Sequence, residues 1–354
     1  MALADAGHEL SLLTLRHDIE DFFDVPATVR RQRVDRAVAD DCRWFDLKAQ
    51  LRRWRLFRQA VLATRPQVVV SFIDTNNITV LLSLWCSGVP VVVSERVNMQ
   101  HHDIGLRWRV LRILTYPQAA AVVVQTQQAM VRSAMRHRRW RLMQIPNLIE
   151  PPAAGTTCTA SLEHLAGAHL KTGPQVLAVG RLHQQQGFDL LIRAFALLPA
   201  RHRQTRLLIL GEGSERNSLE RLVTDLHLEG RILLPGVVKD PQSWMVDSDL
   251  VFLSSRYEGF PTVLAEAMAA GCPVISTACP DGPSEMIRHG LDGILIHPQD
   301  VAGLAAAIDQ LLGDDDLRSE LARSAMQITQ RYCTAAVVQQ WVHLLEDVVI
   351  GPLT

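Results

Sequence analysis

Residues 252–293 contain the pattern that most restricts how this chain can fold, because short apolar runs alternate there with loops and helix signals. The apolar run 249–254 has the length of a strand and ends in a polar loop. Pro261 fits a first helical position, and Gly271 fits the position just past the helix end. A second strand, 272–276, and a second loop then repeat the plan. Two helix N-termini are therefore expected at one end of a parallel sheet, where free N–H groups and the helix dipole favour an anion such as phosphate.

Two glutamates accompany the first of these helices. Glu258 is expected just outside its N-terminus and Glu266 about a turn and a half inside, with seven residues between them. Two such glutamates alone are more typical of the exposed face of an amphipathic helix. Together with Gly-Phe-Pro after Glu258 and the later loop 281–285, however, the pattern resembles the paired-glutamate motif of the large family of retaining GT-B glycosyltransferases (family 4 type), which build bacterial surface polysaccharides, lipopolysaccharide cores and glycolipids.

This resemblance implies an α/β fold with two doubly wound, Rossmann-like domains facing a cleft. The length of 354 residues fits two domains, and 48% hydrophobic residues suffice for two cores. We expect an acceptor-side domain at 1–150, a linker at 151–172, a nucleotide-sugar-binding domain at 173–330, and at 331–354 a helix that by resemblance crosses back to the first domain. Strands alternating with helices from residue 68 onward predict a parallel, doubly wound sheet.

The charge is distributed unevenly along the chain. Residues 1–150 contain 21 basic and 14 acidic residues, whereas the rest contains 15 basic and 23 acidic ones. A basic first half suits an anionic partner, lipid or phosphate, and an ordinary solvated surface is the alternative. No nucleic-acid partner is expected.

The six cysteines are scattered, without the pairing of a metal site and without a secretory leader before them. We therefore expect a cytoplasmic chain without a metal or another cofactor. The longest uncharged stretch, 75–94, is interrupted by polar residues and divides into a helix and a strand, so contact with the inner face of a membrane would be peripheral.

The chain begins with what we predict to be the last turns of a helix, residues 1–7, followed by a strand at 8–15. The resembled family has an earlier central strand and a glycine-rich loop, so we expect a shortened or misassigned start, or a degenerate gene copy. Loss of a strand buried on both faces predicts that residues 1–150 are poorly stable and that the chain transfers sugar weakly or not at all. Residues 171–330 are expected to fold independently and to keep nucleotide affinity.

Residues 18–65 are predicted to form a polar loop and then a helix at 47–63. Within that helix, residues 51–58 alternate basic and apolar side chains, which indicates either a membrane-surface or acceptor-side helix, or a half-buried domain helix with solvated arginines. The basic cluster 136–141 resembles a membrane-facing patch or is the solvated end of a helix. The loop 74–77 is expected at the carboxyl end of a strand, where such folds bind ligands.

The loop after residue 94 is where a catalytic histidine is expected by resemblance. The family often has Ser-Glu-His there, and this chain has Ser94, Glu95 and Arg96. Glu95 is therefore a catalytic candidate, and His101 or His102 could take the place of the histidine in space.

The resemblance also assigns the donor site. Arg181 is matched to the diphosphate, Glu258 to the sugar and Glu266 to the ribose hydroxyls, with Arg181 and Glu258 also counted as catalytic. Gln186 occupies the position of a family lysine and brings no charge; because charge-assisted hydrogen bonds are roughly twice as strong as neutral ones, weaker donor binding or a different phosphate clamp is expected. Backbone contacts to phosphate, sugar or base are expected from further residues of the loops, namely Gly236, Gly259, Phe260, Pro261 and Thr262.

The first hypothesis is a retaining glycosyltransferase that moves a hexosyl or N-acetylhexosaminyl group from a nucleotide-sugar, UDP-linked, to a saccharide or lipid-linked saccharide acceptor. The second is a degenerate, non-catalytic nucleotide-sugar-binding protein of the same fold. A sugar-nucleotide epimerase of this fold is a third reading, which the paired glutamates disfavour.

Overall fold

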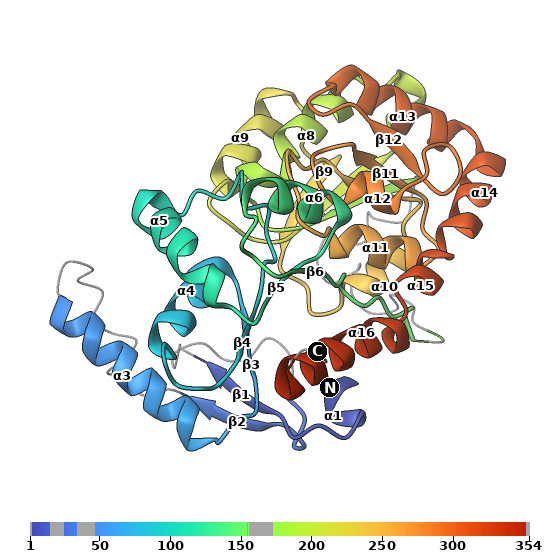
Figure 1. Ribbon diagram of the computed structural model, residues 1–354. Coiled ribbons are helices and arrows are strands. Elements are labelled where there is room, and N and C mark those ends of the chain that lie inside the picture. Colours follow the sequence, from blue (N-terminus) through green and yellow to red (C-terminus); the bar gives the residue numbers. More distant parts are fainter. Residues whose placement is uncertain (1, 15–24, 34–46, 154, 156–172, 352–354) are drawn as a thin grey trace. The chain divides into compact units, whose positions relative to one another are not determined.

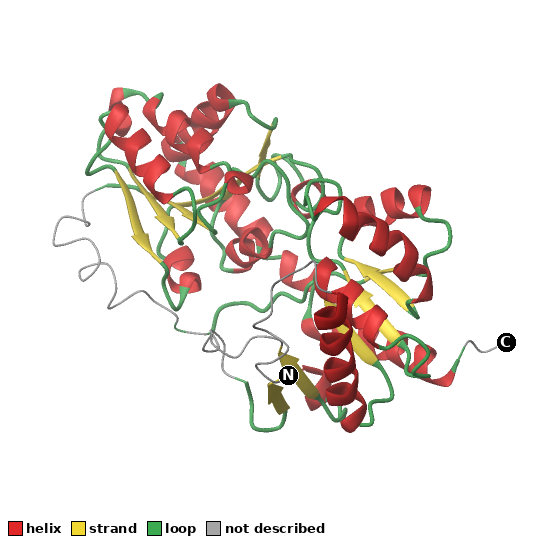
Figure 2. Cartoon of the chain, turned by 90° about the vertical axis from the view of Figure 1, so that its left-hand side faces the viewer, coloured by secondary structure: helices red, strands yellow, loops and turns green. Residues whose placement is uncertain are grey.

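The computed structural model describes residues 2–14, 25–33, 47–153, 155 and 173–351. The chain divides into two compact units, the first comprising Met1–Pro146 with Thr334–Thr354 and the second Asn147–Cys333. Parallel strands flanked by helices build each unit (Figures 1 and 2). Most of the predicted linker 151–172 lies outside the described residues.

The second unit is built on a six-stranded parallel sheet with the order β12-β11-β10-β7-β8-β9. Strand order reverses between the central neighbours β7 and β10, and in open α/β sheets ligands bind outside the carboxyl ends of the strands at such a point. The strands are β7 (Gln175–Val179), β8 (Arg206–Leu210), β9 (Ile232–Gly236), β10 (Leu250–Leu253), β11 (Val274–Thr277) and β12 (Ile294–Ile296).

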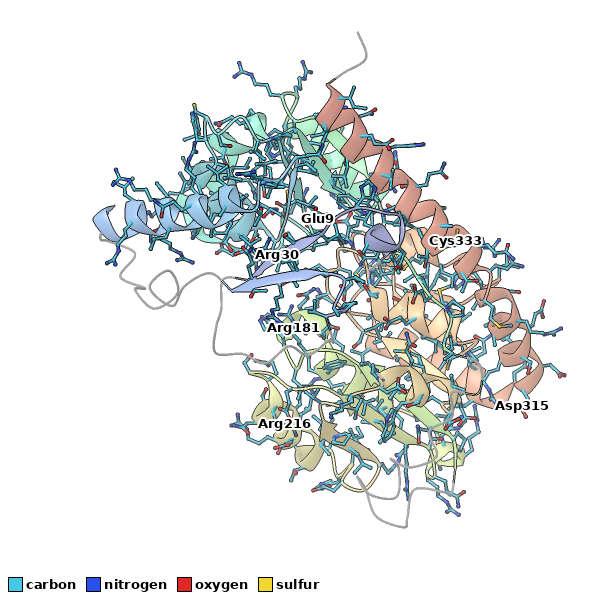
Figure 3. All side chains as sticks on the ribbon, turned by 90° about the horizontal axis from the view of Figure 1, so that it is seen from below. Glu9, Arg30, Arg181, Arg216, Asp315 and Cys333 are labelled. Carbon is cyan, nitrogen blue, oxygen red and sulfur yellow. The ribbon has the colours of Figure 1, made fainter. Side chains whose placement is uncertain are left out.

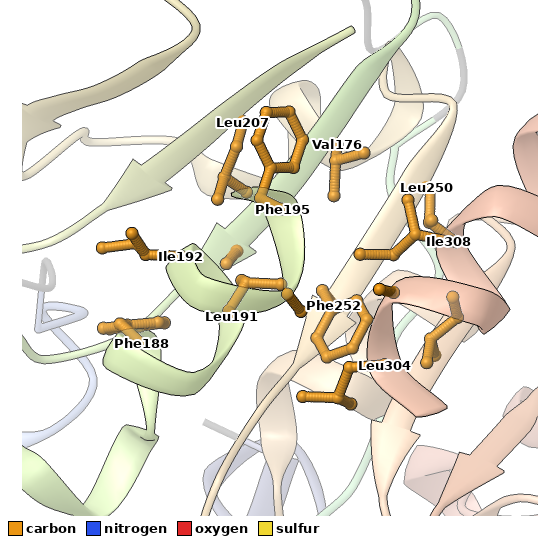
Figure 4. Close-up of a cluster of buried hydrophobic side chains, with 14 of the residues drawn as sticks. Val176, Phe188, Leu191, Ile192, Phe195, Leu207, Leu250, Phe252, Leu304 and Ile308 are labelled. Carbon is orange, nitrogen blue, oxygen red and sulfur yellow. The ribbon is translucent and has the colours of Figure 1, made fainter. Parts of the chain in front are cut away.

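Both faces of this sheet are buried, because alternate side chains of each strand enter different cores. Val176 of β7 and Phe252 of β10 pack with Phe195 on one face (Figure 4), whereas Leu177 and Leu253 pack on the other. The helices of this unit are α8 (Phe188–Ala196), α9 (Arg216–Asp225), α10 (Pro241–Val246), α11 (Thr262–Ala269), α12 (Pro283–Met286), α13 (Val301–Gly313), α14 (Asp315–Ala325) and α15 (Ile328–Arg331), with 3-10 turns η2 (Gln184–Gln186) and η3 (Ala200–His202).

The strands of the first unit form two separate parallel sheets, β1-β2 and β3-β4-β5-β6. In the larger sheet β3 is an edge strand. The sequence interpretation expects an earlier strand to be missing here, and that shortening stays a prediction. The strands are β1 (Ser11–Thr14), β2 (Arg30–Arg33), β3 (Val69–Phe72), β4 (Val91–Ser94), β5 (Ala121–Val124) and β6 (Leu142–Gln144).

Helices pack on this larger sheet from distant parts of the sequence. The C-terminal helix α16 buries Val337 and Leu344 against Val92 and Val123 of the sheet, so it belongs to the first unit. The remaining helices of the unit are α1 (Ala2–Asp5), α3 (Leu47–Ala63), α4 (Asp74–Ser83), α5 (Gly105–Thr115), η1 (Tyr116–Gln118) and α6 (Gln127–Arg136), and α16 itself is Thr334–Ile350.

Three expectations about these elements need correction. Residues 74–77 are not a loop but the first turn of α4, which begins directly at the end of β3. Strand β2 lies within the region predicted as a loop, because an Arg-Arg-Gln-Arg sequence has no apolar alternation to reveal it. Pro261 precedes the first turn of α11 rather than opening it.

Helix α3 is the half-buried domain helix of the two readings given above. Phe57 and Val61 are 5% and 3% exposed and join the core that includes Ile78 and Tyr116. Its apolar stripe is therefore used inside the unit.

Candidate donor-binding site

Two loops meet at the carboxyl ends of the central strands β7 and β10. The backbone N–H of Arg256 donates to the carbonyl of Gln185 at 2.8 Å, and the Ser254 hydroxyl donates to the carbonyl of Gln186 at 2.7 Å. Gly187 has φ +64°, and a Cβ there would lie 2.2 Å from the Ser254 carbonyl oxygen. The approach of the two loops therefore requires glycine at this position.

The Glu258 carboxylate is held where these loops touch. Its Oε1 accepts hydrogen bonds from Ser255 Oγ at 2.6 Å and from Gln186 Nε2 at 3.3 Å. The residue is 9% exposed. Burial raises the pKa of the Glu258 carboxyl, while the hydrogen bonds from Ser255 and Gln186 and the charge of Arg181 act in the opposite direction.

The structure thus brings three of the predicted donor residues together: Gln186, Glu258 and, through its charge, Arg181. Ser255 is a further partner of Glu258 that the sequence interpretation missed. Ser255 lies three residues before Glu258 in the loop after β10. A serine in a polar loop is too common to be singled out from the sequence.

Arg181 and Arg216, both labelled in Figure 3, differ in the hydrogen-bond and ion-pair partners of their guanidinium groups. Arg216 on α9 is bound by Glu212 at 2.5 Å and by Glu220 at 2.8 Å. Arg181 is exposed, and no hydrogen bond or ion pair to it is found among the described residues. Its charge is therefore available to an anion, as a diphosphate clamp requires.

The turn 259–261 leads from Glu258 into the N-terminus of α11. Gly282 packs on this turn with φ +64°, and a Cβ there would lie 2.3 Å from Pro261 Cδ and 3.0 Å from the Gly259 carbonyl oxygen. Phe260 is 7% exposed and packs edge-on against Tyr332, while Thr262 Oγ1 accepts a hydrogen bond from Asn147 Nδ2 at 3.1 Å. The turn is therefore fixed from several sides before any ligand binds.

Glu266 lies on α11 and is partly buried. Burial raises the pKa of its carboxyl, and no hydrogen-bond partner for it is found within the described residues. Gly236 ends β9 with φ +96°, and its carbonyl accepts a hydrogen bond from the Gly211 N–H at 2.8 Å. Both residues belong to the carboxyl side of the same sheet.

A second group of polar side chains is buried at the carboxyl ends of β3 and β4 in the first unit. Glu95 is 3% exposed and accepts a hydrogen bond from the Tyr116 hydroxyl, which also receives one from Asn77 Nδ2 at 3.3 Å. Burial raises the pKa of Glu95 to about 7, the Tyr116 hydrogen bond opposes this, and nearby Asp74 adds to it while Arg112 opposes it. The catalytic role expected for Glu95 stays a prediction.

His102 lies beside this group, bound to a carboxylate that the sequence interpretation did not assign. Its Nδ1 is 2.7 Å from Oδ2 of Asp74, whose side chain is fully buried, while the His102 side chain is 43% exposed. A carboxylate on one ring nitrogen fixes the orientation of the imidazole. No signal in the sequence connects these residues, because Asp74 and His102 are 28 positions apart.

Two absences are limited to the part of the chain that the structure describes. No cluster of three or more His, Cys, Asp or Glu side chains suitable for a metal ion occurs there. None of the helices there is long and apolar enough to cross a membrane.

The match to a known protein family lies within the second unit of the chain. Residues 164–327 match the family described as glycosyl transferases group 1. HepE of Anabaena, solved in complex with UDP and glucose, has a similar structure, with a TM-score of 0.73 and 22% identity over 90% of this chain and 86% of that one. The fold is thus that of the GT-B proteins, and residues 164–327 are similar to group 1 glycosyl transferases.

Two relatives match nearly the whole chain in sequence. An exopolysaccharide phosphotransferase of Streptomyces coelicolor is 30% identical over 95% of this chain, which spans only 38% of that relative's length. An α-1,4-N-acetyl-D-galactosaminyltransferase of Campylobacter jejuni is 25% identical over 96% of this chain and 91% of its own. The name of the latter gives an undecaprenol diphosphate-linked saccharide as its acceptor.

Proposed function

We propose that the chain is a retaining glycosyltransferase that moves a sugar from a UDP-sugar to a saccharide or lipid-linked saccharide acceptor. The observation that carries this proposal is the position of Glu258. Its carboxylate is fixed by Ser255 and Gln186 between the two central strands of a doubly wound sheet, directly before the N-terminus of α11. An oriented carboxylate can accept hydrogen bonds from the hydroxyls of a sugar. A helix N-terminus and the Arg181 cation can bind a diphosphate, so the site suits a nucleotide-sugar.

Each proposed role follows from the chemistry of the group. Glu258 accepts hydrogen bonds from sugar hydroxyls, and Glu266 accepts them from the ribose. Arg181 and the backbone N–H groups of Gly259 to Thr262 stabilise the negative charge that develops on the leaving diphosphate. Glu95, the remaining catalytic candidate, lies in the first unit close to Asp74, the carboxylate that binds His102.

The comparisons support the classes of donor and acceptor. UDP and glucose are bound in HepE, and an undecaprenol-linked saccharide is the named acceptor of the Campylobacter enzyme. The relatives named for an exopolysaccharide and for a lipid-linked saccharide support a role in the synthesis of surface polysaccharide or glycolipid.

The site assignment is tested by titrating UDP into the parent protein and into Glu266→Ala. Hydrogen bonds to a charged group contribute about 1.5–3 kcal/mol, so the variant should bind UDP roughly 10- to 100-fold more weakly. Glu320→Ala, which removes an exposed carboxylate from α14, is the matched control and should bind as the parent does. Parent-like UDP affinity in Glu266→Ala would show that this glutamate does not contact the nucleotide.

One observation favours a second function, nucleotide-sugar binding without catalysis. The side chain bonded to Glu258 comes from Gln186, which donates hydrogen bonds but carries no charge to balance a leaving diphosphate. The two functions differ in one result: both predict UDP binding, but only the first predicts turnover of a UDP-sugar.

A further inference from the structure

Helix α5 of the first unit turns its aliphatic face outward. Its inner face carries an arginine and a threonine that are buried, with a tryptophan and a leucine that pack against the core. The side chains of the outer face are exposed to 76% (Leu106), 47% (Val110), 55% (Ile113) and 61% (Leu114). A surface helix of a soluble domain normally has the reverse arrangement.

The positions of these side chains form one continuous stripe. Successive residues of an α-helix are turned by roughly 100°, so positions 106, 110, 113 and 114 cover an arc of about 100°. Arg107 lies at one edge of this arc and Arg109 at the other, and both are exposed. Arg109 also pairs with Asp103 at 3.0 Å, just before the helix. An aliphatic stripe bordered by arginines is the pattern of a helix that lies in a membrane interface.

The only charged residues in the sequence that contains α5 are arginines. Between residues 104 and 149 the chain has no Asp, Glu or Lys and eight arginines, namely Arg107, Arg109, Arg112, Arg132, Arg136, Arg138, Arg139 and Arg141. Of these, Arg112 is buried and takes no part in surface binding. The aliphatic stripe therefore lies in a segment whose net charge attracts an anionic surface.

We propose that the outer face of α5 docks the protein onto an anionic lipid membrane, with the four aliphatic side chains in the acyl boundary and Arg107 and Arg109 at the headgroups. A second copy of the chain is a poorer occupant, because pairing two such faces would bring arginines of like charge together. Helix α3 does not compete for this role, since Phe57 and Val61 on its apolar stripe are buried.

The proposal is tested by sedimentation of the full chain with vesicles of phosphatidylcholine, with and without about 30% phosphatidylglycerol. The parent should bind the anionic vesicles more tightly and lose binding at about 0.5 M salt, where surface charges are screened. The double variant Leu106→Glu/Ile113→Glu should bind at least tenfold more weakly, and Arg107→Gln should weaken binding about fivefold on anionic vesicles only.

The matched control is Leu197→Glu/Leu291→Glu, which adds the same charges at two exposed leucines of the second unit, 59% and 47% exposed. It should bind vesicles within about twofold of the parent, since substitutions on an exposed surface rarely disturb folding. Equal loss in both double variants would mean that added negative charge alone repels the vesicle, and would overturn the docking face. Absence of vesicle binding by the parent would also overturn it, as would sedimentation as a dimer that Leu106→Glu/Ile113→Glu converts to a monomer.

Discussion

At the scale of single residues, the most consequential side chain is Gln186. It contacts Glu258 at 3.3 Å, and it stands where the resemblance expects a lysine, which leaves Arg181 as the one side-chain cation assigned to the diphosphate. Gln186→Lys should therefore tighten UDP binding about tenfold, the equivalent of ~1.4 kcal/mol, because it replaces a neutral donor with a charge-assisted one. Isothermal titration at low and high salt measures the effect, which should shrink as salt is added.

The control for this substitution is Gln185→Lys in the same loop. The Gln185 side chain donates to the Tyr257 carbonyl at 3.1 Å rather than to Glu258. A similar gain in both variants would indicate a general effect of added charge. No gain in either would place the phosphates away from this loop.

At the scale of elements, the buried polar group of the first unit joins the loop after β4 to α4 and η1 through Glu95, Asn77 and Tyr116. Burial of Glu95 raises its pKa from 4.5 to about 7. Between these two values the folded state keeps a proton that the unfolded state has lost, so stability falls as the pH rises from 4.5 to 7 and then levels off. The loss is on the order of 3 kcal/mol.

Glu95→Gln removes this titration while keeping the shape of the side chain. The free energy of unfolding of the variant minus that of the parent should therefore increase as the pH rises from 5 to 8. Hydrogen exchange of the β4 and β5 amides measures this difference. Glu9→Gln, at an exposed carboxylate of the same unit, should follow the parent. If the stability of Glu95→Gln and that of the parent changed with pH in parallel, the pKa of Glu95 would be the same in the folded and unfolded states, which would contradict the prediction.

The sequence was sufficient for elements whose periodicity is unambiguous. Helix α3 has the predicted bounds, and the repeated strand-loop-helix plan around Glu258 is present. The alternation of strands and helices from residue 68 onward is also present, yet the outward aliphatic face of helix α5 was not predicted. A periodic pattern shows that a helix has an apolar stripe, but only the packed unit shows whether that stripe is covered.

The candidate site was predictable to the extent that its residues share one loop. Glu258 and the turn that follows it belong to a single recognisable motif, whereas the bond from Gln186 to Glu258 and the pairing of His102 with Asp74 join positions 72 and 28 apart. Such contacts depend on the order of strands in a sheet. Alternation of strands and helices predicts a parallel sheet but leaves that order open.

At the scale of the whole molecule, the central claim is that this chain transfers sugar with retention of configuration from the site at Glu258. The most direct measurement is ¹H NMR of the first products formed from UDP-glucose, UDP-N-acetylglucosamine and UDP-N-acetylgalactosamine, with Glu258→Gln as the matched variant. We predict that at least one of these α-linked donors is consumed, that the first product has the α configuration, and that Glu258→Gln slows its formation at least 100-fold, as expected for loss of a charged contact to the reacting sugar. A β product, or an α product formed equally fast by Glu258→Gln, would contradict the account, and UDP binding without consumption of any donor would favour the non-catalytic function instead.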